Sequence, residues 1–264
     1  MPGGDGRSAG DYGHGGGAVN ILALESSATA CSAALCRDGA LLAQSFQCSG
    51  LTHSRTLLPM VNDLLKNCGQ TLEQVDVIAV AAGPGSFTGL RIGVATAKGL
   101  AWAGDKPCAP CSTLESMAWP LAHLEGALIV CAMDARRAQV YNALFLARGE
   151  GLGRLTPDRA ISLAELGEEL KNFPEIKIVV GDGAQLCYNT LREKVPGLTL
   201  APVHLRMQSA WGVARAAEGL IVSEGLVSGA ELVPVYHRLS QAERERLERE
   251  QNTKFTIEGD QKHV

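Results

Sequence analysis

Residues 19–47, VNILALESSATACSAALCRDGALLAQSFQ, decide the fold of this chain. The segment holds three short apolar stretches, 19–25, 31–36 and 40–47, each of strand length and each ended by polar residues. Arg37-Asp38-Gly39 supplies a tight turn, because glycine reaches positive φ without steric cost. We therefore predict three successive strands joined as a meander.

Helix and strand patterns alternate after the meander. Residues 52–68 place Leu57, Leu58, Val61, Leu64, Leu65 and Cys68 on one helical stripe. A buried strand is expected at 75–82, a helix at 88–103, and a further helix near Thr113, where Ser112 and Glu115 have capping-box spacing. The order β-β-β-α-β-α predicts an α/β fold with a mixed sheet flanked by helices, as in the actin-like, ribonuclease-H-like half-domain.

The second half of the chain reads as a shorter copy of this unit. Strands are expected at 128–133, 140–146 and 176–180, and helices at 162–171, 184–194 and 209–223, with a further strand at 233–237. We predict two unequal subdomains with flanking segments: a glycine-rich disordered leader at 1–18, subdomains at 19–126 and 127–238, and a charged tail at 239–264.

Composition restricts the function classes. The formal net charge is −4 and aromatic residues make up 5%, whereas RNA recognition relies on basic grooves and aromatic platforms. A stand-alone RNA-binding module is therefore not favoured, and we expect any role in RNA chemistry to be reached only through a partner. Most cysteines lie in apolar stretches, and no stretch is long enough to span a bilayer. We expect a cytoplasmic protein without a membrane contact.

The segment 81–93, AAGPGSFTGLRIG, is the first candidate site. A strand, a glycine-rich turn and a helix start can hold phosphate, although the lysine of a P-loop is absent. Together with the turn after the first strand, it gives a candidate nucleotide contact made of Glu25, Ser26, Ser27, Gly85 and Ser86. The alternative is a tight strand-to-helix turn in which Ser86 or Thr88 caps the helix.

Small residues recur every four positions along the helix that follows. Gly89, Gly93, Ala97 and Ala101 would leave a flat groove against which another helix can pack closely. The partner helix could belong to this chain or to another subunit, and the residues alone leave both open.

Other reactive residues form no recognisable centre. Cys108 and Cys111 have C-x-x-C spacing, but no second pair completes a zinc site and no thioredoxin-like context surrounds them. The histidines are scattered without an H-x-x-x-H pair, and no G-x-S-x-G elbow occurs. We therefore expect no catalytic residues and no bound metal.

Four blocks of sequence carry a resemblance to the TsaB (YeaZ) family. They are ILALESSATACSAAL, LTHSRTLLPMVNDLL, AAGPGSFTGLRIGVATAKGLA and MDARRAQVYNALF, with VVGDGA near 179 and PVYHR near 234 in support. The resemblance spans roughly residues 19–240. It implies an actin-like fold and a role in placing threonylcarbamoyl on adenosine 37 of ANN-decoding tRNAs.

The resemblance also implies what this chain lacks. TsaD, the catalytic paralogue, carries an H-x-x-x-H metal pair, and the matching positions here are Thr113 and Met117. A hydroxyl and a thioether do not replace two imidazoles at such a metal. The family also often has aspartate where this chain has Glu25, which disfavours independent nucleotide hydrolysis.

What remains is binding to partners. The family pairs with TsaD through its first two helices, which maps the interface onto Leu57, Val61, Leu64, Gly89, Arg91, Gly93, Ala97 and Ala101. The resemblance further implies a TsaE ATPase in the complex, a homodimer in isolation, and ATP or ADP only as a loosely held group at the subunit interface. We expect a non-catalytic scaffold; the alternative is a free-standing actin-like ATPase or a glycoprotease-type metallopeptidase.

Overall fold

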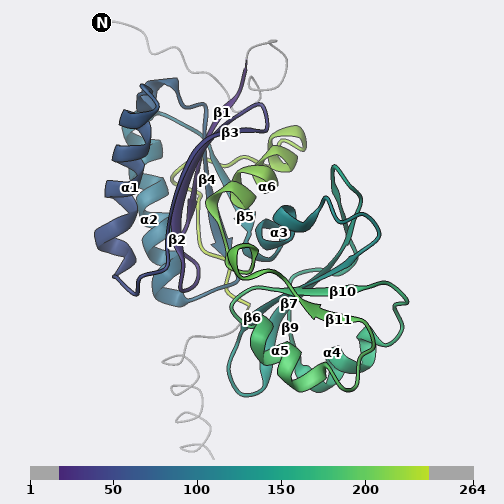
Figure 1. Ribbon diagram of the computed structural model, residues 1–264. Helices are drawn as coiled ribbons and strands as arrows, with labels where there is room; N and C mark the ends of the chain where they lie inside the picture. The colour runs from purple at the N-terminus through teal and green to yellow at the C-terminus, as the bar shows by residue number, and fades with distance from the viewer. Residues whose placement is uncertain (1–17, 238–264) are drawn as a thin grey trace, which may run out of the picture.

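The computed structural model describes residues 18–237, which fold around two mixed β-sheets with helices between and outside them (Figure 1). Residues 1–17 of the expected leader and the expected tail at 239–264 lie outside the described residues.

The first sheet begins with the predicted meander. Strands β1 (Asn20–Glu25), β2 (Cys31–Arg37) and β3 (Ala40–Gln47) are antiparallel neighbours. Strand β4 (Val77–Gly83) pairs in parallel with β1, and β5 (Cys108–Ser112) pairs in parallel with β4. The order β3-β2-β1-β4-β5 is that of the actin-like, ribonuclease-H-like unit, and the predicted fold class is confirmed.

Strand β5 is missing from the predicted elements. Its sequence, CAPCS, has no β-branched or aromatic residue and contains Pro110, so it carries no strand signal of its own. It lies at the edge of the sheet, where a proline is tolerated because no further strand needs its missing N–H group. Pairing with β4, from Ile78 opposite Cys108 to Ala81 opposite Cys111, makes it a strand.

The second sheet has the order β11-β10-β6-β7-β8, and β9 also pairs with β7. Its strands are β6 (Leu128–Asp134), β7 (Gln139–Ala147), β8 (Leu152–Arg154), β9 (Arg159–Ser162), β10 (Lys177–Val180) and β11 (Leu198–Leu200). Strands β6 and β7 form an antiparallel hairpin, whereas β10 runs parallel to β6. The short strands β8, β9 and β11 were not predicted.

The helices form the remaining layers. They are α1 (His53–Asn67), α2 (Phe87–Gly104), α3 (Thr113–Ala118), α4 (Leu163–Leu170), α5 (Ala184–Leu191) and α6 (Ala210–Val222). Helices α1 and α2 cover one face of the first sheet, and α4 and α5 cover the outer face of the second (Figure 1). Helices α3 and α6 pack together between the two sheets. None of the described helices combines the length and apolarity that a bilayer crossing requires.

The C-terminal part of the described chain returns to the first sheet. Helix α6 lies in the range predicted as the second subdomain, yet Ala210, Val213 and Ala217 are buried against β1 and β4 of the first sheet. The strand expected at 233–237 is wrong: this segment forms no ladder and makes one backbone hydrogen bond to the sheet, from Val235 N to Ala82 O at 2.7 Å.

Candidate functional site

The two turns predicted to hold a nucleotide do meet in space. The loop after β1 and the loop before α2 are joined by a hydrogen bond from Ser86 N to Ser27 O at 2.7 Å. A second bond runs from Ser26 Oγ to the carbonyl oxygen of Gly89 at 2.9 Å. Ser86 also caps α2, because its side chain accepts the N–H of Gly89.

The same contacts explain the glycines without a ligand. A Cβ atom at Gly85 would lie 2.6 Å from Ser27 O, and one at Gly89 would lie 2.1 Å from Ser26 O. The two loops therefore press backbone against backbone, and glycine is required for that approach. The nucleotide contact stays a prediction, and a phosphate between these loops would need them to separate.

Glu25 is the most perturbed acid of this junction. It is fully buried, and burial is the main cause that raises its pKa to about 7. Contact with Ser27, whose N–H donates to Glu25 Oε1 at 2.5 Å, acts in the opposite direction. The negative charge of Asp182, in the loop between β10 and α5, adds to the rise. Among the described residues, Glu25 Oε2 has no hydrogen-bond partner.

Most of the predicted interface points inward, and that part of the prediction is wrong. Gly93 and Ala97 of α2 are buried against the first sheet, and a Cβ at Gly93 would lie 2.5 Å from Ser26 Oγ. The other residues buried in the same way are Leu57, Val61, Leu64, Gly89 and Ala101. The small side chains let α2 approach its own sheet closely. Of the predicted set, only Arg91 is exposed.

A second small-residue stripe faces solvent instead. Ala95, Gly99 and Ala103 are exposed and also recur every four residues. Each follows a residue of the buried stripe by two positions, so this second stripe lies about 200° around the helix from the first. A Cβ at Gly99 would meet nothing within 4 Å. Leu58 on the adjacent α1 is 46% exposed, and Trp102 is 89% exposed. We call these five residues the outer helix face.

The positions that the sequence resemblance assigns to the metal ligands of TsaD do not form a metal site. Thr113 and Met117 lie on α3, both buried, and Met117 packs in the core below the second sheet. Over residues 18–237, no group of three or more histidine, cysteine or acidic side chains has the arrangement of a metal site. The donor set therefore does not fit the metal of the catalytic paralogue.

The cysteine pair is structural. Cys108 and Cys111 lie three residues apart on β5, so their side chains point to opposite faces and enter different core clusters. Burial raises the pKa of Cys108 to about 11 and that of Cys111 further, so neither is a reactive thiolate at neutral pH.

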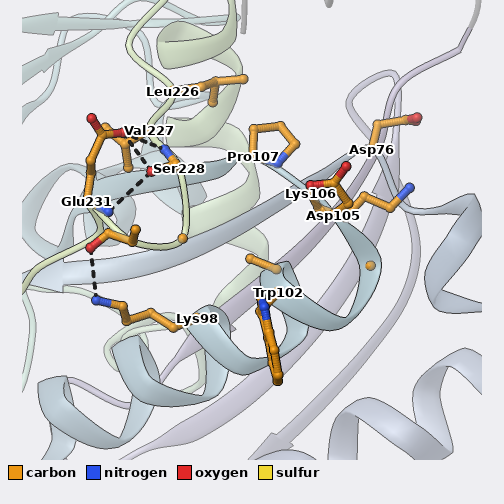
Figure 2. Close-up of a pocket in the computed structure, with 14 residues that line it drawn as sticks. Asp76, Lys98, Trp102, Asp105, Lys106, Pro107, Leu226, Val227, Ser228 and Glu231 are labelled. Atoms are coloured by element: carbon orange, nitrogen blue, oxygen red, sulfur yellow. Dashed lines mark hydrogen bonds between the residues drawn. The ribbon is translucent and has the colours of Figure 1, made fainter. Parts of the chain in front are cut away.

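A pocket of about 830 Å³ lies at the C-terminal end of α2, under the loop 226–231 (Figure 2). Lys98 fastens this loop, because its Nζ donates to the carbonyl oxygens of Ala230 at 3.2 Å and Leu232 at 3.1 Å. Leu232 is fully buried in the core beside α2. Beyond it, the ring of Tyr236 stacks on Phe87 at 4.5 Å, and Tyr236 Oη accepts from Arg91 Nε at 3.1 Å. We call residues 226–237 the strap. The sequence predicted only a strand at 233–237 and missed the strap itself, because residues 226–232 carry no regular periodicity.

Comparison with known proteins gives a consistent answer. The family model described as "TsaD: tRNA N6-adenosine threonylcarbamoyltransferase" matches residues 48–194. The TsaB protein of Escherichia coli is 32% identical over 222 residues, covering 83% of this chain and 95% of that protein. The TsaB protein of Bacillus subtilis is 36% identical over 168 residues, covering 64% of this chain and 73% of that protein.

Solved structures agree with the sequence relatives. YeaZ from Pseudomonas aeruginosa is 28% identical, with a TM-score of 0.68 over 83% of this chain and 99% of that one. A second Pseudomonas aeruginosa structure, described as similar to the peptidase YeaZ, has a TM-score of 0.71 at 28% identity, over 83% of this chain and all of that one. The chain therefore belongs to the TsaB (YeaZ) family of tRNA threonylcarbamoyladenosine biosynthesis proteins.

Proposed function

We propose that this chain is a non-catalytic scaffold subunit, which binds a TsaD-type paralogue and a TsaE-type ATPase in the cytoplasm. The assembled complex then transfers threonylcarbamoyl to adenosine 37 of ANN-decoding tRNAs. In this proposal the TsaD-type partner modifies the tRNA, and this chain contributes binding surfaces that hold the complex together.

The observation that carries the proposal is that α3 has no metal-binding side chains at Thr113 and Met117. In the sequence resemblance, the two metal-binding imidazoles of TsaD fall at the positions occupied here by Thr113 and Met117. Both side chains are buried, and the thioether of Met117 packs in an apolar cluster with Leu114, Ile129 and Phe145. A metal-bound substrate would find neither donors nor space beside this helix, so the protein's contribution lies elsewhere on its surface.

The outer helix face supports a docking role. It combines an exposed indole at Trp102 with a small-residue stripe that lets another helix come close. Helices α1 and α2 lie side by side on the same face of the first sheet (Figure 1), so a paired subunit can present two helices to them. A related subunit built on the same fold would have the matching pair.

Reconstitution tests the proposal. The chain alone, a TsaD-type subunit alone, and the two together with a TsaE-type ATPase are incubated with an ANN-decoding tRNA transcript, an activated threonylcarbamoyl donor and ATP. We expect modified adenosine only when this chain and the TsaD-type subunit are both present. Modification by this chain alone, or full modification without it, would contradict the scaffold role.

A further inference from the structure

The tip of the β6–β7 hairpin holds an uncommon backbone conformation. Arg136, Arg137 and Ala138 have φ angles of 62°, 54° and 54°, which lie in the left-handed region. Tight hairpins normally place asparagine or glycine there, because other side chains crowd the backbone. Three successive left-handed residues, none of them asparagine or glycine, lower the stability of the hairpin. Backbone strain of this kind is concentrated at functional sites.

The backbone of the tip is fixed without help from the arginine side chains. Ala135 N donates to Gln139 O, and Gln139 N donates to Arg136 O, both at 3.1 Å. Arg136 N donates to Asp134 Oδ1 at 2.7 Å. Leu163 N, at the start of α4, donates to Ala138 O at 3.1 Å and ties the tip to the second sheet's helix layer.

Neither guanidinium group has an interaction partner in the described part of the chain. Arg136 and Arg137 are exposed, and no side-chain hydrogen bond, ion pair or ring contact engages either of them within residues 18–237. Two other arginines on strands of the second sheet do form ion pairs. Arg154 pairs with Glu115 and Asp158, and Arg159 pairs with Glu169. The carboxylate of Asp134 is tied to the tip's own backbone.

We propose that Arg136 and Arg137 contact the phosphate backbone of the tRNA on which the complex acts. Guanidinium groups bind phosphate oxygens with paired, charge-assisted hydrogen bonds. Phosphate contacts position an RNA without reading its sequence, which suits two arginines on a rigid turn. The net charge of −4 makes the chain a poor RNA binder by itself, so the tip acts as a local cationic contact inside the complex. The inference rests on the proposed function.

The test uses the full chain in complex with its TsaD-type and TsaE-type partners, and an unmodified ANN-decoding tRNA transcript as the probe. The double variant Arg136→Gln/Arg137→Gln is compared with Arg192→Gln, an exposed arginine of the same unit whose nearest carboxylate, that of Glu193, is 4.0 Å away. We expect the double variant to raise KM for tRNA about 10-fold with kcat unchanged, and to lower the salt dependence of binding by about two phosphate contacts. Arg192→Gln should change neither.

Two readouts separate this inference from the proposed function. Gel filtration reports whether each variant still assembles, and fluorescence anisotropy over a range of salt concentrations reports tRNA binding by the assembled complex. If assembly and modification are intact but KM and the salt dependence are unchanged in the double variant, the inference is overturned. If the wild-type chain does not assemble with its partners, the proposed function fails, and the inference, which places the tip inside the complex, fails with it.

Discussion

The carbonyl oxygen of Ser26 lies so close to Gly89 that a Cβ atom at position 89 would be 2.1 Å from it. This contact joins the end of β1 to the first turn of α2, and it holds the two turns of the candidate nucleotide site together. The glycine-rich sequence there is thus explained by the packing of the chain against itself.

Replacing Gly89 with alanine should be costly. The added methyl group would clash with backbone, which cannot rotate away, so we expect Gly89→Ala to lower the free energy of unfolding by about 3 kcal/mol. Gly99→Ala is the matched control on the same helix, because a Cβ there meets nothing within 4 Å. It should raise the free energy of unfolding by about 1 kcal/mol through helix propensity. Urea titrations of both variants measure the difference, and equal effects would argue against the close approach.

At the tip of the β6–β7 hairpin, a substitution should raise the free energy of unfolding, whereas Gly89→Ala should lower it. Because Ala138 has a φ of 54°, Ala138→Gly should relieve steric crowding and raise the free energy of unfolding by about 1 kcal/mol. Ala160→Gly, at an exposed position of β9, should lower it by about 0.5–1 kcal/mol, since glycine loses more entropy in a strand. Urea unfolding of the two variants compares them directly. A loss of stability in Ala138→Gly would show that the tip is not strained.

Stability should fall as the pH rises through neutrality, because of Glu25. Its pKa is raised from 4.5 in the unfolded chain to about 7 in the folded one, so the folded state binds the extra proton between these values. The associated stability is fully present below about pH 4.5 and is lost as the pH passes 7. A shift of this size corresponds to a few kcal/mol, on the order of 3. Glu25→Gln should flatten this part of the profile in urea titrations from pH 5 to 8, and an unchanged slope would rule out Glu25 as its source.

The strap depends on Lys98. Lys98→Met keeps the aliphatic stem but removes the donors to Ala230 and Leu232, so the loop 226–231 should open more often. Hydrogen exchange should speed up at Val227 N and Val235 N, which donate to Cys108 O and Ala82 O. Amides in β6 and β7 serve as the internal control and should not change. Uniform acceleration across the chain would instead indicate global destabilisation.

Much of the fold could be predicted because its central elements have strong local signals. The meander, α1, α2 and the β6–β7 hairpin have clear periodicity or turn residues, and their bounds shift by only one or two positions. Strand β5 could not be predicted, since CAPCS becomes a strand only by pairing with β4. Helix α6 was found, but no sequence pattern indicates which of two sheets an apolar helix will cover.

The docking surface was harder to predict from the sequence than the fold, because α2 carries two stripes of small residues. Gly93 and Ala97 lie on one, and Ala95 and Gly99 lie on the other. Helical spacing is identical in both, so it cannot decide which one the chain's own sheet will bury. The exposed Trp102 is the signal that could have helped, since a large apolar side chain in phase with Ala95 and Gly99 marks that side as a contact surface.

The affinity of this chain for a TsaD-type subunit, measured by calorimetry for Gly99→Arg and Gly219→Arg, tests the docking role most directly. Both glycines lie inside exposed helix faces with no atom within 4 Å of a Cβ, so both variants should fold like the wild type. If α1 and α2 form the docking surface, Gly99→Arg should weaken binding about 100-fold, or about 2.7 kcal/mol, while Gly219→Arg on α6 changes it less than about twofold. Wild-type affinity in Gly99→Arg would contradict the docking surface on which the proposed function rests.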